Sequence, residues 1–88
     1  MSWNIHFMPD ECDSISVNIN GESWTTWNAS EGDTRKDLPS KWANNNKIKV
    51  YAAVHPEGKN GSMDVCWDGD VRQEFRFDAD EDHDVERP

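Results

Sequence analysis

The chain has 88 residues and a net charge of −9, and only 34% of its residues are hydrophobic, although these include five tryptophans and three phenylalanines. This length predicts one domain with a small core built largely from aromatic side chains. The acidic balance argues against direct nucleic-acid binding, which needs cations to neutralise phosphates, and against docking on anionic membranes.

Strand patterns begin at the N-terminus. Residues 3–8 and 14–20 each alternate between apolar and polar side chains, as strands with one dry face do. Asn20-Gly21 is typical of a two-residue type I′ hairpin loop, so we expect a third strand over residues 22–27.

The register of this hairpin decides where two tryptophans point. A two-residue loop pairs Val17 with Trp24, and residues opposite each other share a face of the sheet. Trp24 is therefore expected in the core. Trp27 falls on the opposite face, beside Ser14, where it is exposed to solvent unless a second layer covers it.

The middle of the chain is less regular. Residues 34–38 have the length of a short edge strand, which Pro39 closes. A single helical turn beginning at this proline would place Trp42 at one end of the core. Residues 47–55 alternate again and predict the best strand of this region.

The last third of the chain carries the longest alternation. Residues 63–67 and 71–79 predict the two strands of a hairpin, with Phe75 and Phe77 on its dry side and charged residues on its wet side. One ribbon would then supply both a wall of the core and most of the negative charge.

A parity argument, which asks whether residues opposite each other in the hairpin lie on the same face of the sheet, favours a three-residue loop. A two-residue loop at Asp68-Gly69 would place Val65 opposite Arg72, and such a slip moves a whole set of side chains to the wrong face. A three-residue loop that begins at Trp67 pairs Val65 with Val71 instead. The same loop shifted by one residue keeps the parity and stays open as an alternative.

Together these elements predict an all-β fold. Six or seven short strands joined by turns every 8–12 residues are typical of a small antiparallel β-sandwich or a partly open barrel. We expect residues 1–79 to form a single β domain. Residues 80–88 are expected to be an acidic C-terminal tail or a short edge strand.

Negative charge concentrates in the terminal hairpin and beyond it. Residues 64–86 hold ten acids against two bases, Arg72 and Arg76, which interrupt the acidic pattern. Same-face neighbours on a strand are roughly 6.5–7 Å apart, so the carboxylates are expected to imitate a row of phosphates and bind a basic protein surface. The candidate partner-binding residues are Asp64, Asp68, Glu74, Asp78, Asp80, Asp82 and Asp84.

Metal binding and catalysis find little support. Asp78, Asp80 and Asp82 match the first three ligand positions of an EF-hand loop, but the sixth position is His83 instead of glycine, and no helix precedes them. The histidines and cysteines lack metal-ligand spacing, and no catalytic signature is present. We therefore expect no cofactor, no metal and no enzymatic activity; a looser calcium site at the sheet edge stays open as an alternative.

Aromatic residues support an alternative function. Trp27, Trp42 and Tyr51 would form a platform on which a sugar ring stacks, with nearby Asn and Asp side chains holding its hydroxyls. This alternative is a lectin-like β-sandwich that binds a carbohydrate or another small ligand.

The N-terminus shows no signal-peptide pattern, so we expect a cytoplasmic protein with reduced Cys12 and Cys66. In size and charge the chain resembles phage anti-defence inhibitors, such as anti-CRISPR proteins and DNA mimics, and toxin-immunity proteins. The resemblance implies an inhibitor that blocks a basic, nucleic-acid-binding surface of a partner protein.

Overall fold

The computed structural model describes residues 1–88 and is all-β, with eight strands, a 3-10 turn at Ala29–Glu31 and one short helix. The strands are β1 (Trp3–Met8), β2 (Ser14–Ile19), β3 (Glu22–Asn28), β4 (Thr34–Asp37), β5 (Lys47–His55), β6 (Gly61–Trp67), β7 (Asp70–Phe77) and β8 (Glu81–Glu86); the helix is α1 (Ser40–Ala43). The prediction of an all-β chain is confirmed. The predicted number of strands was too low.

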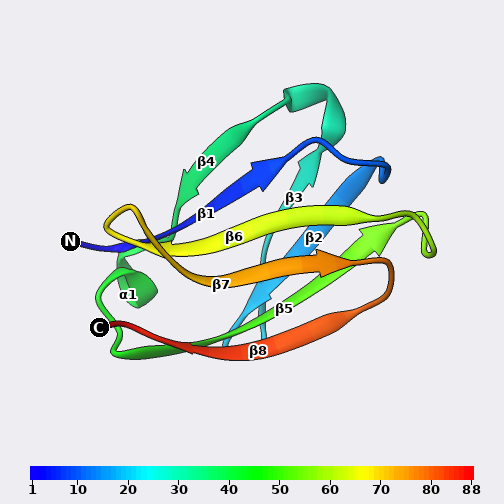
Figure 1. Ribbon diagram of the computed structural model, residues 1–88. Helices are drawn as coiled ribbons and strands as arrows, with labels where there is room; N and C mark the ends of the chain where they lie inside the picture. The colour runs from blue at the N-terminus through cyan, green and yellow to red at the C-terminus, as the bar shows by residue number, and fades with distance from the viewer.

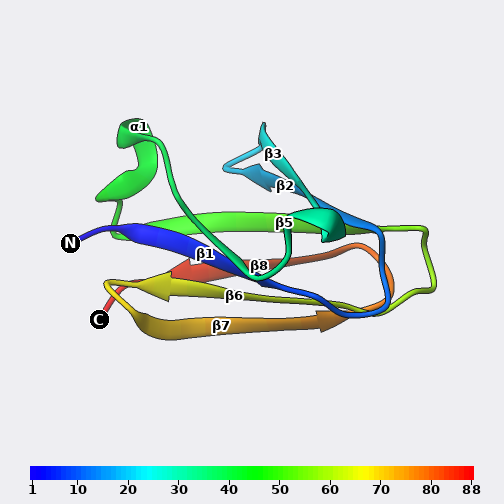
Figure 2. The ribbon, with the colours of Figure 1, turned by 90° about the horizontal axis from the view of Figure 1, so that it is seen from above.

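The strands form two antiparallel sheets of four strands each. The first sheet has the order β4-β1-β6-β7 and the second has the order β3-β2-β5-β8 (Figures 1 and 2). Only β2–β3 and β6–β7 are hairpins within one sheet, because the other connections between consecutive strands pass from one sheet to the other. The edge strands β7 and β8 are consecutive in the chain and lie side by side.

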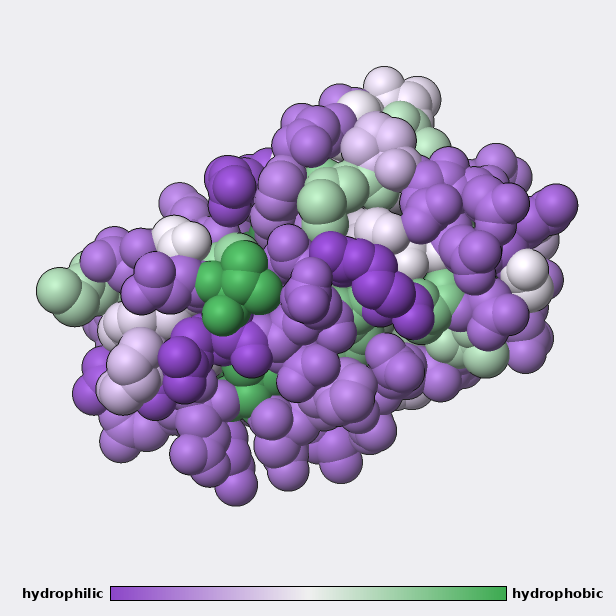
Figure 3. All heavy atoms as spheres, in the orientation of Figure 1, coloured by the Kyte–Doolittle hydropathy of each residue, from purple (hydrophilic) through white to green (hydrophobic).

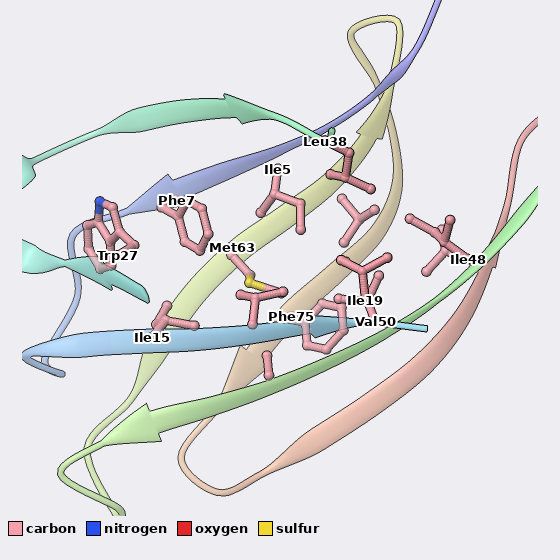
Figure 4. Close-up of a cluster of buried hydrophobic side chains, with 14 of the residues drawn as sticks. Ile5, Phe7, Ile15, Ile19, Trp27, Leu38, Ile48, Val50, Met63 and Phe75 are labelled. Atoms are coloured by element: carbon pink, nitrogen blue, oxygen red, sulfur yellow. The ribbon is translucent and has the colours of Figure 1, made fainter. Parts of the chain in front are cut away.

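A single cluster of 20 buried residues fills the space between the sheets. Figure 4 shows side chains from both sheets pointing into it, with Phe7 beside Trp27 and Met63 near Phe75. The rings of Phe7 and Trp27 stack with centroids 5.6 Å apart. The burial of Phe75 and Phe77, at 0% and 6% exposure, confirms the predicted dry face of the terminal hairpin.

Several local predictions are confirmed as well. Asn20 and Gly21 have φ values of 52° and 82°, as a type I′ turn requires. β4 is an edge strand, and α1 places Trp42 in the core at 6% exposure. None of the helical segments has the length and apolarity needed to span a bilayer.

The predicted face of Trp27 was wrong, because β3 contains an extra residue. The register shifts between Val17 and Asn18, so that Trp24 has no direct partner and Ile15 lies opposite Trp27. A β-bulge of this kind reverses the parity of every residue beyond it. Trp27 therefore enters the core at 0% exposure, and its indole nitrogen donates a hydrogen bond to the Gly32 carbonyl at 3.0 Å.

The predicted loop of the terminal hairpin was also wrong. Asp68 and Gly69, with φ values of 50° and 89°, form the two-residue turn that the parity argument rejected. The register shifts between Val65 and Cys66, where Arg72 is the extra residue of a β-bulge. Because of this extra residue, the strands beyond the bulge again pair apolar residues with apolar residues. Val71 precedes this bulge and is 51% exposed instead of facing Val65.

Gly61, the first residue of β6, packs tightly against side chains of the core. A Cβ atom at this position would lie 2.7 Å from Val54 Cγ1 and 3.3 Å from Cys12 Sγ. We expect Gly61→Ala to lower the free energy of unfolding by about 1–2 kcal/mol, because the added methyl overpacks the core. Urea unfolding measures this loss. The double variant with Val54→Ala, which makes room for the methyl, should lose less than the two single losses combined. Full additivity would contradict the close approach.

Candidate protein-interaction surface

The seven carboxylates predicted to bind a partner do not form one row. Asp64 and Glu74 lie on the outer face of the first sheet, and Asp68 lies in the β6–β7 turn at one end of the hairpin. The other four follow β7: Asp78 and Asp80 lie in the β7–β8 connection, and Asp82 and Asp84 lie on β8 of the second sheet.

Asp64 already forms an ion pair within the chain. β6 is an inner strand, flanked by β1 and β7, and this leaves Asp64 only 9% exposed. Arg76 Nη1 donates to Asp64 Oδ1 at 3.0 Å, while its Nη2 donates to Glu74 Oε2 at 3.1 Å. Arg76 thus neutralises part of the charge that the sequence pattern had assigned to the binding surface.

Much of the outer face of the first sheet is polar. Figure 3 shows hydrophilic residues over most of the face in view, with small and separate hydrophobic spots. Val71 is one of only three large hydrophobic residues in the chain that are exposed. Contiguous apolar patches mark hydrophobic docking sites, and this face offers none.

The exposed carboxylates of the β7–β8 connection and of β8 form a second group, which we call the acidic edge. It consists of Asp78, Asp80, Asp82, Asp84 and Glu86, all of them exposed. Lys49 Nζ, 3.6 Å from Asp82 Oδ2, is the only lysine or arginine nitrogen that forms an ion pair with this group. The Tyr51 hydroxyl donates a hydrogen bond to Asp80, which raises the pKa of Tyr51.

His83 points away from the acidic edge. Its ring lies edge-on to Phe75, with centroids 5.0 Å apart, and its Nε2 is 3.5 Å from Glu81 Oε2. No group of three or more His, Cys, Asp or Glu side chains in the chain has a geometry that could hold a metal ion.

The two cysteines are free and buried. Cys12 is 2% exposed and Cys66 is 1% exposed. Burial, followed by the negative charge of Asp10 near the first thiol and of Asp64 near the second, raises the pKa of both thiols. Protonated thiols are poor nucleophiles and poor metal ligands.

The sequence analysis did not identify one polar cluster on the second sheet. Ser16 Oγ lies 3.1 Å from His55 Nε2 and 3.1 Å from Thr26 Oγ1. The sequence could have indicated this cluster, because Ser16 and His55 lie on the same face of two strands that pair. No other hydrogen bond orients the histidine ring, whereas an activated hydroxyl needs such an orienting group. The cluster links three neighbouring strands across their exposed face.

The predicted aromatic platform is not presented to solvent. Trp27 and Trp42 belong to the core, at 0% and 6% exposure, and only Tyr51 remains partly exposed, at 36%. Tyr51 borders a surface hollow of about 290 Å³. The hollow is lined by Asn18, Gly21, Lys49, Tyr51 and Asp82.

Comparison of the chain with protein-family models, with curated proteins and with solved structures found no match.

Proposed function

We propose that this chain is a non-enzymatic, acidic protein-binding module that docks its acidic edge on a basic surface of a partner protein. The observation that supports the proposal is the charge of residues 78–86. This segment holds six acids and no lysine or arginine, and a single lysine from outside it forms an ion pair with it.

The position of these carboxylates suits long-range attraction. They project from a connection and an edge strand, and alternate residues of a strand are roughly 6.5–7 Å apart, near the spacing of phosphates along a nucleic-acid strand. Unpaired charges of one sign raise the association rate with an oppositely charged surface. We propose that the two sheets form a β-sandwich, with residues 1–79 as its body, that holds this row rigidly.

The chain would act as a cytoplasmic inhibitor, comparable to anti-CRISPR or toxin-immunity proteins, that covers a nucleic-acid-binding surface of its partner. It would need no cofactor, and would bind neither nucleic acid nor a membrane itself. The basis for this class is the small size of the chain and its net charge of −9. A carboxylate row competes with phosphates for the same lysines and arginines.

A charge-reversal variant tests the acidic edge. We expect the triple variant Asp78→Lys, Asp80→Lys and Asp82→Lys to bind its partner at least about tenfold more weakly at low salt, because attraction becomes repulsion. Binding of the unchanged chain should also fall at about 0.5 M salt, where the Debye length shrinks to roughly 4 Å. Pull-downs from a host-cell lysate at both salt concentrations, followed by titration of the captured protein, measure these effects.

A second triple variant provides the matched control. Asp13→Lys, Asp37→Lys and Asp70→Lys change the net charge by the same amount, at exposed positions that form no ion pair. This control should retain the partner. Equal losses in both triple variants would show a dependence on net charge alone, and binding that survives both the edge reversal and high salt would refute the proposal.

The hollow at Tyr51 favours a second candidate function, the binding of a carbohydrate or another small ligand. An exposed aromatic ring beside the Asn18 amide and the Asp82 carboxylate offers both a stacking surface and hydroxyl partners. A glycan array at about 0.5 M salt separates the two functions, because sugar binding tolerates screening. A sugar that binds on the array should bind the Tyr51→Ala variant much more weakly, whereas the Tyr51→Phe variant should keep much of the affinity.

A further inference from the structure

β8 is an edge strand of the second sheet: β7 of the first sheet lies beside it, but no strand is paired with its outer side. It pairs with β5 on one side only and ends the second sheet. Natural edge strands are usually blocked by proline, lysine or a bulge. Residues 81–86 contain no proline and no lysine, and the β5–β8 register runs without a shift. The feature that remains to discourage pairing of this edge with another chain is its negative charge.

The register shows which backbone groups of β8 are free. In an antiparallel pair, alternate residues direct both their N–H and their C=O groups toward the partner strand. Arg87 donates its N–H to the Asn46 carbonyl at 3.0 Å, in line with the β5–β8 register, so the odd-numbered residues of β8 bond to β5. Asp82, Asp84 and Glu86 therefore direct their backbone groups toward the open edge. On this side the Glu86 carbonyl already accepts a hydrogen bond from Arg72 Nε at 3.1 Å, so the groups left for a partner are those of Asp82 and Asp84 and the Glu86 N–H.

The same three residues carry the exposed carboxylates of β8. We infer that the open edge of β8 accepts an extended basic segment of the partner protein as a fifth strand of the second sheet. This inference rests on the proposed function and names its mode of contact. The backbone ladder would supply affinity, and lysine or arginine at alternate positions of the added strand would meet Asp82, Asp84 and Glu86.

Charge selects this occupant over a second copy of the chain. Two β8 strands side by side would place like charges opposite each other, which destabilises a strand pair. The other edges suit a basic segment less well. β4 has four residues, of which Arg35 and Lys36 are basic; β3 contains a bulge; and β7 carries Arg72 and Arg76.

A synthetic peptide in which lysine and threonine alternate, KTKTKTKT, provides a defined probe. On its addition, we expect the amide hydrogens of Asp82, Asp84 and Glu86 to exchange at least about tenfold more slowly, because they become hydrogen-bonded. The amides of His83 and Val85 already bond to β5 and should change little. The block peptide KKKKTTTT, of equal charge, should bind at least about threefold more weakly, since it cannot place a lysine opposite each acid.

Substitutions at Asp84 separate strand addition from simple charge attraction. Asp84→Asn removes the charge and keeps the free N–H, whereas Asp84→Pro removes both; proline is tolerated at an edge position whose N–H faces solvent. We expect the proline variant to bind the alternating peptide at least about fivefold more weakly than the asparagine variant. A thermal melt checks the fold of both variants, and the amide exchange of the unchanged chain gives a readout that does not depend on them.

Each outcome has one meaning. Equal weakening in the two variants, with no slowing at Asp82, Asp84 and Glu86, would leave attraction by charge in place and overturn strand addition. Binding that neither variant weakens would overturn the proposed function as well. A concentration-dependent dimer in sedimentation experiments, broken by Asp84→Pro, would assign the edge to a second copy of the chain and overturn the basic segment as its occupant.

Discussion

Replacement of Trp27 by alanine is expected to lower the free energy of unfolding by about 3–5 kcal/mol. The side chain is 0% exposed, and its ring stacks on Phe7 at a centroid distance of 5.6 Å and an interplanar angle of 8°. Truncation removes the buried area, leaves a cavity beside Phe7 and deprives the Gly32 carbonyl of its 3.0 Å hydrogen bond. Urea unfolding followed by circular dichroism measures the loss, and the m value shows whether the unfolding stays two-state.

Tyr51→Ala is the matched control for this variant. Tyr51 lies at 36% exposure on the outer face of the second sheet, so its removal should change stability by about 0.5 kcal/mol or less. A Trp27→Ala variant as stable as this control would mean that Trp27 points to solvent, and that the bulge at Trp24 is absent.

Removal of the Arg76 guanidinium has the second largest expected effect. Asp64 is a carboxylate with a side-chain exposure of 12%, and Arg76 is its only ion-pair partner. Arg76→Ala leaves this charge poorly solvated and unpaired, which costs about 3–5 kcal/mol in a fully buried pair. Arg76 itself is 47% exposed, and water reaching the site reduces the expected loss to about 2–3 kcal/mol. Urea unfolding measures this loss.

The other carboxylate bound by Arg76 provides the control. Glu74 has a side-chain exposure of 65%, so Glu74→Gln should cost no more than about 0.5 kcal/mol. Adding Asp64→Asn to Arg76→Ala should recover part of the loss, because the stranded charge is removed. A double variant that loses the full sum of both single changes would contradict a coupling between Asp64 and Arg76.

Some parts of the structure follow directly from the sequence. Two-residue alternation predicts strands at 3–8, 14–20 and 47–55, and Asn20-Gly21 predicts the hairpin turn that follows the second of them. The dry side of the terminal hairpin was equally readable from Phe75 and Phe77. These features are local: they depend on which face a side chain occupies and on which residues tolerate a positive φ.

The two bulges were not readable in this way. An extra residue at Trp24 or at Arg72 is not visible in a count of alternating residues, but it changes which residues lie opposite each other and which face the residues beyond it occupy. The parity argument assumed an uninterrupted ladder and therefore rejected the correct turn at Asp68-Gly69. Packing against the other sheet decides between such registers, because it rewards the register that buries Trp27 beside Phe7.

The sequence by itself determined the all-β class, the identity of most strands and the surplus of carboxylates near the C-terminus. Only the tertiary structure decided that β7 and β8 belong to different sheets, so that Asp64 and Glu74 share Arg76 while Asp82 and Asp84 line an open edge. The physical reason is that side-chain period is fixed within a strand, whereas sheet membership and charge pairing depend on contacts between residues far apart in the chain.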